Sequence, residues 1–161
     1  MQILVELDGV LRDKDESIIP IGVIMYGTLT VYNRMTIISS MTEADTKRWL
    51  DINKVVDYDL IIDNSVYLVG ENPQERQINF ARSQGGIDLF ITGNPKLWAY
   101  AFNLGIPSVM FGVPSYTRVE FRPDAPKKVR AWTDIEEAIE KQNQMRTQDA
   151  RLTRTEALNF E

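Results

Sequence analysis

The chain contains no cysteine and no histidine among its 161 residues. The absence of cysteine excludes disulfides and thiolate chemistry. The absence of histidine removes the commonest general base, the Ser-His-Asp triad and imidazole metal ligands. Any chemistry in this chain therefore depends on carboxylates, hydroxyls, lysine, arginine or a hard metal ion.

Long apolar runs and the glycine patterns of phosphate-binding loops are also missing from the sequence, and residues 1–30 do not show the pattern expected of a cleavable leader. Eighteen basic residues against twenty-three acidic ones give a net charge of −5, so no overall positive field attracts nucleic acid or anionic lipid. We therefore expect a cytoplasmic protein that does not enter a membrane, with nucleic acid disfavoured as a partner.

Short runs rich in Ile, Leu and Val alternate with stretches that have helical character. The runs indicate strands covered on both faces, and the alternation predicts a parallel sheet with helices on both sides. We expect a Rossmann-like three-layer α/β/α domain over residues 1–142, followed by a helical or flexible extension over residues 143–161. The predicted strands are residues 3–7, 35–39, 60–62, 66–69, 89–92 and 108–111. The predicted helices are residues 42–51, with Thr42 as a candidate cap, residues 73–84, where Pro73 fits the first turn, and residues 95–104, closed by Gly105.

Two segments depart from this alternation. Residues 12–26 place a charged tip between two apolar runs, which predicts a β-hairpin flap beside the end of the first strand, and residues 27–34 could form a short helix. Near the C-terminal end, Thr133 can cap a helix that begins close to Asp134 and has a modest apolar face. Beyond this helix the chain is either a helical continuation that packs on a partner or a frayed tail.

The first strand delivers two acids and then a glycine, in the order Glu6, Leu7, Asp8, Gly9. The carboxyl ends of parallel strands are where open α/β sheets bind ligands. Glu6 and Asp8 therefore mark a candidate site, although such a pair can also cap a neighbouring loop or take a salt bridge without chemistry.

These residues resemble the first motif of the haloacid dehalogenase (HAD) superfamily, and the resemblance extends over roughly residues 1–111. Most members are magnesium-dependent phosphatases in which an apolar strand ends in Asp-x-Asp-Gly. The first Asp attacks phosphorus and the second acts as general acid and base. Glu6 stands at the nucleophile position here and Asp8 at the acid–base position. The short span to the second strand is similar to capless members, and the chain also looks like small phage-encoded HAD-like proteins.

The resemblance assigns roles to residues further along the chain. Ser39, at the end of the second strand, matches the hydroxyl that binds the phosphoryl group, with Ser40 beside it as a further ligand contact. Arg76 is the best match to the family's basic residue, and Arg82 is second. Asn94 falls in the turn where active members place the acids that hold magnesium, so it is predicted to contact the ligand and to be at most a weak metal ligand.

The departures from the family pattern weaken the case for catalysis. Glutamate is one methylene longer than aspartate, and a displacement of ~1 Å can cost ~100-fold in rate. Mg²⁺ prefers anionic oxygens in near-ideal geometry, whereas Asn94 offers only a neutral amide oxygen. Glu6 and Asp8, together with Asn94, are therefore predicted to be weak ligands of a Mg²⁺ ion at most. These changes reduce the preorganised charge that stabilises a phosphoryl-transfer transition state.

A second cluster, which interleaves cations with aromatic residues, follows the last predicted strand. Its arginines, Arg118 and Arg122, could grip a phosphorylated ligand near the site, or they could remain solvated while Tyr116 and Phe121 pin the loop.

Three hypotheses for the function follow from the sequence. The first is a HAD-like protein with a degenerate site that acts as a binding or structural module. The second is an active magnesium-dependent phosphohydrolase on an exposed or macromolecular phosphate. The third is an assembly component that forms a homo-oligomer through its C-terminal helix.

Overall fold

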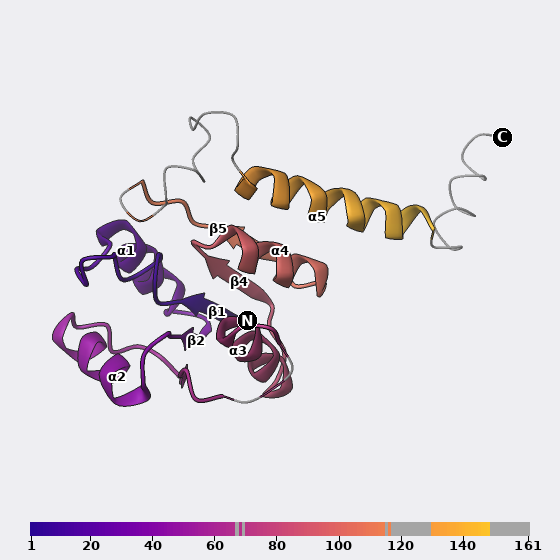
Figure 1. The fold of residues 1–161 in the computed structure, drawn as a ribbon. Coiled ribbons are helices and arrows are strands. Elements are labelled where there is room, and N and C mark those ends of the chain that lie inside the picture. The colour runs from indigo at the N-terminus through magenta and orange to yellow at the C-terminus, as the bar shows by residue number, and fades with distance from the viewer. Residues whose placement is uncertain (67, 69, 115, 117–129, 149–161) are drawn as a thin grey trace.

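The computed structural model describes residues 1–66, 68, 70–114, 116 and 130–148. Within them the chain forms one five-stranded sheet with helices on both faces (Figure 1). The strands are β1 (Gln2–Glu6), β2 (Arg34–Ile38), β3 (Leu60–Ile62), β4 (Leu89–Thr92) and β5 (Ser108–Met110). The helices are α1 (Pro20–Leu29), α2 (Glu43–Ile52), α3 (Pro73–Ser83), α4 (Pro95–Asn103) and α5 (Arg130–Thr147).

All strand pairs in the sheet are parallel, and the strand order is β3-β2-β1-β4-β5. The chain therefore adds strands on one side of β1, then crosses over and continues on the other side. Such a reversal opens a crevice at the carboxyl ends of the central strands. The predicted α/β class with a Rossmann-like parallel sheet is confirmed.

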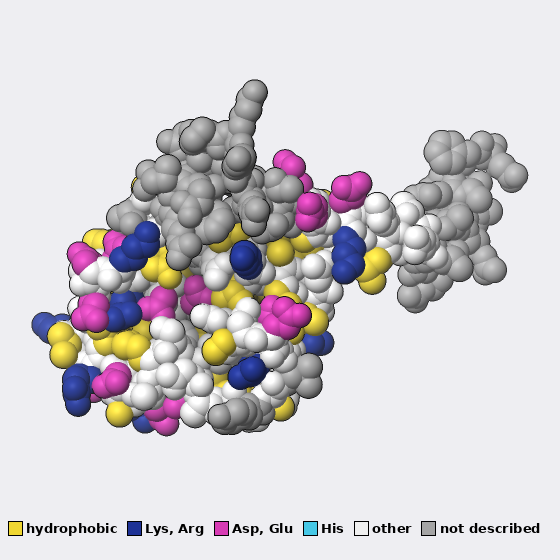
Figure 2. Space-filling view, viewed as in Figure 1, with side chains coloured by type: hydrophobic (Ala, Val, Ile, Leu, Met, Phe, Trp, Pro, Cys, Tyr) yellow, Lys and Arg dark blue, Asp and Glu magenta, His cyan; other side chains and the backbone are white. Residues whose placement is uncertain are grey.

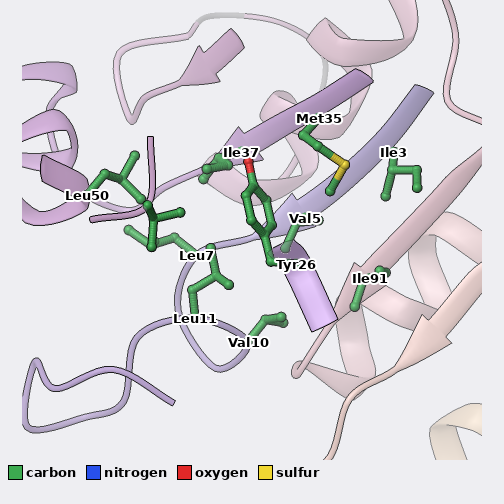
Figure 3. Packing of buried hydrophobic residues seen from close by; sticks show 11 residues of the cluster. Ile3, Val5, Leu7, Val10, Leu11, Tyr26, Met35, Ile37, Leu50 and Ile91 are labelled. Atoms are coloured by element: carbon green, nitrogen blue, oxygen red, sulfur yellow. The ribbon is translucent and has the colours of Figure 1, made fainter. Parts of the chain in front are cut away.

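The hydrophobic core is divided into two layers by the sheet. One layer packs Tyr26 of α1 and Leu50 of α2 against Val5 and Ile37, which point to the same face of adjacent strands (Figure 3). The other layer packs α3 and α4 against the opposite face, for example through Leu97. Because strand residues alternate between faces, every central strand needs apolar residues at consecutive positions, as the sequence runs indicate.

Helix starts follow the caps that the sequence offers. The Thr42 hydroxyl accepts a hydrogen bond from the Asp45 amide at 3.2 Å and begins α2, as predicted. The side chains of Asn72 and Asn94 do the same for α3 and α4. Each cap satisfies a backbone donor that the first helical turn leaves without an internal partner.

Helix α1 corrects the prediction for residues 12–34. The hairpin was expected to extend to Tyr26, but α1 begins at Pro20, and no helix occupies residues 30–34. Proline is favoured in a first helical turn, and Tyr26 faces the core with its hydroxyl donating to the Asp57 carbonyl at 2.7 Å. The error arose because α1 is apolar on all sides and contains β-branched residues, so its sequence lacks a helical period.

Two further segments differ from the sequence-based expectation. Val66 and Leu68 are not in a strand, and the other two residues of the predicted strand 66–69 lie outside the described part of the chain. Helix α5 begins at Arg130, before the expected start near Asp134, and continues past residue 142 to Thr147. Among the described residues, no helix combines the length and apolarity needed to cross a membrane.

Candidate functional site

The candidate site lies at the carboxyl ends of β1, β2 and β4. Its cleft has a volume of about 300 Å³. Glu6 and Asp8 come from the end of β1, Ser39 and Ser40 follow β2, and Asn94 follows β4. The other lining residues are Arg12, Asp13, Lys14, Ile38, Gln74, Gln77 and Tyr116. The parallel sheet thus gathers five residues that the sequence singled out: Glu6, Asp8, Ser39, Ser40 and Asn94.

Glu6 is the most deeply buried acid of the cleft, with 6% of its surface exposed. Burial and the neighbouring charge of Asp8 raise the pKa of Glu6 from 4.5 to about 8, although a hydrogen bond with Thr92 counteracts part of this shift. Its Oε2 atom has no hydrogen-bond partner among the described residues. Glu6 is therefore mostly protonated near neutral pH, and a protonated carboxyl group is a poor nucleophile.

Asp8 has partners for both carboxylate oxygens. Oδ1 accepts a hydrogen bond from Arg12 Nη1 at 2.9 Å, and Oδ2 accepts one from the Ser40 hydroxyl at 2.6 Å. The Arg12–Asp8 ion pair is largely buried, with side-chain exposures of 15% and 19%. Arg12 also reaches Glu16 at 3.0 Å. An arginine thus compensates the charge of Asp8, where an active family member would present the acid–base group.

The loop between β1 and α1 positions Arg12. Its limbs are joined by backbone hydrogen bonds from Asp13 to Ser17 at 2.8 Å and from Ile19 to Leu11 at 2.8 Å. Arg12 and Ile18 form an isolated antiparallel bridge, and the Trp49 indole donates to the Glu16 carbonyl at 2.7 Å. The charged tip therefore folds back beside the cleft. Its identification as a HAD-type flap stays a prediction.

The serines after β2 have different environments. Ser39 is 2% exposed, and its hydroxyl contacts the Thr46 hydroxyl at 2.8 Å and accepts from the Met41 amide at 3.1 Å. Ser40 is exposed, but its hydroxyl is donated to Asp8. The Ser39 hydroxyl is thus occupied by hydrogen bonds to residues before and within α2, whereas the exposed Ser40 hydroxyl is accessible to a ligand.

The predicted basic residue is not among the described residues that line the cleft. Arg76 lies on α3, where its Nε atom donates to the Gly70 carbonyl at 3.2 Å. Its neighbour Gln77 faces the site instead and donates through Nε2 to the carbonyls of Ser39 at 2.6 Å and Asp63 at 2.7 Å. A neutral amide therefore occupies this side of the cleft. Arg118 and Arg122 lie outside the described residues.

Sequence reasoning missed several contributors to the cleft, among them Arg12, Lys14, Gln74 and Gln77. Arg12 was assigned no role beyond the start of the predicted flap, although its i, i+4 spacing from Asp8 could have suggested the ion pair. Lys14 lies 5.8 Å from the centre of the Tyr116 ring. Burial raises the pKa of Tyr116 to about 12, with Glu6 and Asp8 adding to the effect. A Cβ atom added to Gly9 would lie 2.5 Å from this ring, so glycine is required beneath it.

The donor set for a magnesium ion is poor. The Asn94 side-chain oxygen accepts from the Lys96 amide at 3.0 Å, and both oxygens of Asp8 have protein partners. Among the described residues, no group of three or more acids is placed to hold a metal. Mg²⁺ normally takes carboxylates in near-octahedral geometry, so the described residues do not fit this ion well.

Comparisons with models of protein families, with curated proteins and with solved structures find no match for this chain. The structure itself defines an α/β protein with a Rossmann-like sheet and an acid-containing cleft at its switch point. The narrower assignment to the HAD superfamily rests on the motif residues and is a proposal.

Proposed function

We propose that this chain is a HAD-like protein whose phosphatase site is degenerate and that it acts as a binding or structural module with little or no catalytic activity. The observation that carries this proposal is the Arg12–Asp8 ion pair beside a buried Glu6. In the family that the sequence resembles, the first acid attacks and the second transfers a proton. Here the first carboxyl has a pKa of about 8, and the second is bound by a cation and a hydroxyl.

The electrostatics of the cleft support the same conclusion. Nucleophilic attack requires the ionised form of Glu6, which burial and the charge of Asp8 both oppose. Binding a phosphoryl group and its metal would also require Arg12 to move away from Asp8. The partly buried Asp8 carboxylate would then have lost its cationic partner. Breaking such a pair costs several kcal/mol when it is buried. A preorganised site should present its charges to the transition state instead of pairing them internally.

The cleft nevertheless keeps groups that can bind a ligand. Lys14, Ser40 and Gln74 line its accessible part and offer a cation, a hydroxyl and an amide. A phosphorylated ligand therefore remains our proposed ligand class, with the chain holding it but not hydrolysing it.

The test combines turnover and metal binding on the full chain. We expect no hydrolysis above background when the chain is incubated with Mg²⁺ and a broad panel of phosphomonoesters. In calorimetry we expect the chain to show no Mg²⁺ binding that depends on Asp8, so titrations of the natural chain and of Asp8→Asn should give the same heat. Asp15→Asn is the matched control, because Asp15 is an exposed acid at the tip of the same loop. Turnover that is lost in Asp8→Asn and kept in Asp15→Asn would overturn the proposal in favour of an active phosphohydrolase.

A further inference from the structure

Helix α1 has no polar face. No charged residue occurs between Glu16 and Arg34, so the whole helix and both of its flanks are uncharged. Tyr26 is buried against the sheet, whereas Ile21 and Ile24 on the opposite side are 61% and 65% exposed. A helix that is apolar on all sides is ordinarily buried on all sides. The outer face of α1 therefore has the composition of an interface.

The exposed apolar residues extend from the segment before α1, along the helix, to the turn that follows it. A spacing of three residues places Ile21 and Ile24 on one side of α1, and the exposed Val31 and Tyr32 lie in the turn after the helix. We define the α1 surface as the exposed residues Ile18, Ile21, Ile24, Val31 and Tyr32. Five exposed large apolar side chains within residues 18–32, with no charged side chain among them, exceed the singly scattered apolar residues of an ordinary surface and indicate an interaction site.

The chain's own C-terminal helix does not cover the α1 surface in the described residues. Helix α5 packs on α4, where Gln142 donates to the carbonyls of Phe102 at 3.4 Å and Asn103 at 3.3 Å. Ile135 and Ala138 are buried among the α5 residues whose side chains the structure describes. Figure 1 shows α5 running beside α4, on the other side of the sheet from α1.

The distribution of charge around the α1 surface favours a second copy of this chain as the partner that covers it. A two-fold interface brings the same surface of each subunit together, so any charged group near the axis would meet its own copy and repel it. The α1 surface contains no such group. Its two ends carry opposite net charge: Lys14, Asp15 and Glu16, the last paired with Arg12, precede the helix, and the exposed Arg34 follows it. Arg34 forms no ion pair with any other residue that the structure describes.

We propose that two copies of this chain associate through their α1 surfaces as a two-fold dimer with antiparallel helices. In that orientation the acidic end of each α1 surface faces Arg34 of the other copy. Ile24 lies near the middle of the α1 surface, so the two Ile24 side chains lie close to the axis. This proposal is independent of the cleft and of its activity.

Crosslinking gives a direct test, because the natural chain contains no cysteine. We expect Ile24→Cys to form a disulfide-linked dimer under mild oxidation, since the bond requires Cα atoms within roughly 7 Å. Met145→Cys is the matched control. Met145 is 55% exposed but lies on α5, so its variant should remain uncrosslinked. Crosslinking at Met145 and not at Ile24 would overturn the proposal and point to α5.

Association of the full chain is measured by light scattering and sedimentation over a ~100-fold range of concentration. We expect the mass of two chains at high concentration. Ile24→Glu should raise the dissociation constant by roughly 100-fold or more, because like charges at an interface cost several kcal/mol. Met145→Glu should leave it unchanged, and circular dichroism shows that both variants fold. A mass of one chain at every concentration would refute the dimer and imply that another protein covers α1.

Discussion

Glu6 and Asp8 are two residues apart at the end of one strand, yet their surroundings differ. Glu6 is nearly fully buried and forms no ion pair with the residues that the structure describes, while Arg12 and Ser40 bind Asp8. The spacing of the acids predicted that both lie at the carboxyl end of the first strand, where the structure places them. The environment of each acid was not readable from the spacing, because it depends on residues that the fold brings in from β2, β4 and the loop.

The raised pKa of Glu6 predicts a pH dependence of stability. The unfolded chain releases this proton near pH 4.5 and the folded chain near pH 8, so between these values the folded state binds more protons. The contribution of Glu6 is therefore fully present below about pH 4.5 and is lost as the pH rises toward 8. Its slope approaches about 1.4 kcal/mol per pH unit within that window.

Urea unfolding of the Glu6→Gln variant between pH 5 and pH 9 checks this prediction. Glutamine is neutral at every pH, so the variant should lose the downward slope and become relatively more stable above pH 8. Glu43→Gln, at an exposed position on α2, should keep the slope of the natural chain. Identical slopes for Glu6→Gln and the natural chain would show that Glu6 ionises normally.

Gly22 allows α1 to approach the loop after β1. A Cβ atom at this position would lie 1.7 Å from the Val10 carbonyl oxygen, whereas at Gly27 of the same helix it would meet open space. We expect Gly22→Ala to destabilise the fold by about 2 kcal/mol or more, since backbone must move. Gly27→Ala should be neutral or stabilising by up to ~1 kcal/mol.

Denaturant unfolding of both variants in dilute protein makes the comparison. Dilution keeps association from contributing to the measured stability. Equal stabilities for the two alanine variants would mean that α1 does not lie against Val10.

At the scale of elements, the sequence predicted the strands and helices whose residues follow a hydrophobic pattern or begin at a recognisable cap. The apolar runs located all five strands of the sheet, and Thr42, Pro73 and Pro95 marked the starts of α2, α3 and α4. Helix α1 was missed because an all-apolar helix has no period. The tertiary contact at Gly22 and the burial of Tyr26 decide its conformation, and neither is visible in a window of sequence.

The basic position of the site shows a second limit of sequence reasoning. Arg76 was predicted to be the basic residue of the site because of its charge, but the helical turn of α3 directs the side chain of its neighbour Gln77 into the interior of the domain. Adjacent residues on a helix point about 100° apart, so a prediction that is off by one residue selects a different face. Only the register of α3 against the sheet determines which of the two side chains reaches the cleft.

Gln77 should hold α3 to the carboxyl ends of β2 and β3. Its amide group donates to carbonyls of Ser39, Ile62 and Asp63, and the side chain is 1% exposed. Gln77→Leu leaves these acceptors without their donor and should cost about 2 kcal/mol or more in the free energy of unfolding. Gln74→Leu, at a half-buried position one turn earlier on α3, should change stability by less than about 0.5 kcal/mol.

Chemical denaturation of the two leucine variants distinguishes these cases. A second readout is the amide exchange of β3, which should quicken in Gln77→Leu alone. If both variants unfold at the same denaturant concentration, Gln77 is not the link between α3 and the sheet.

On the scale of the whole molecule, charge and apolar surface are distributed differently. Acidic and basic side chains are interspersed on the face shown in Figure 2 and are not gathered by sign. The net charge of −5 could be read from the composition, but the uncharged α1 surface forms only once the fold exposes one side of that helix. The expected route to an oligomer was the C-terminal helix. Among the described residues, α1 and its flanks expose five large apolar side chains, whereas α5 exposes Ile139 and Met145.

Deletion of residues 143–161 separates these two routes. The anchors of α5 on α4, namely Ile135, Ala138 and Gln142, all precede the cut. We expect the shortened chain to keep its fold with a loss of about 1 kcal/mol or less. Its mass in solution should match that of the full chain at equal concentration, because the α1 surface is intact.

Ala138→Glu is the control that damages α5 within the domain. This residue is 4% exposed, so an added carboxylate has no solvent and should lower the melting temperature clearly more than the deletion does. Thermal unfolding and light scattering on both variants complete the experiment. A deletion that halves the mass while leaving the melting temperature in place would make the C-terminal segment the association arm and would contradict the role proposed for α1.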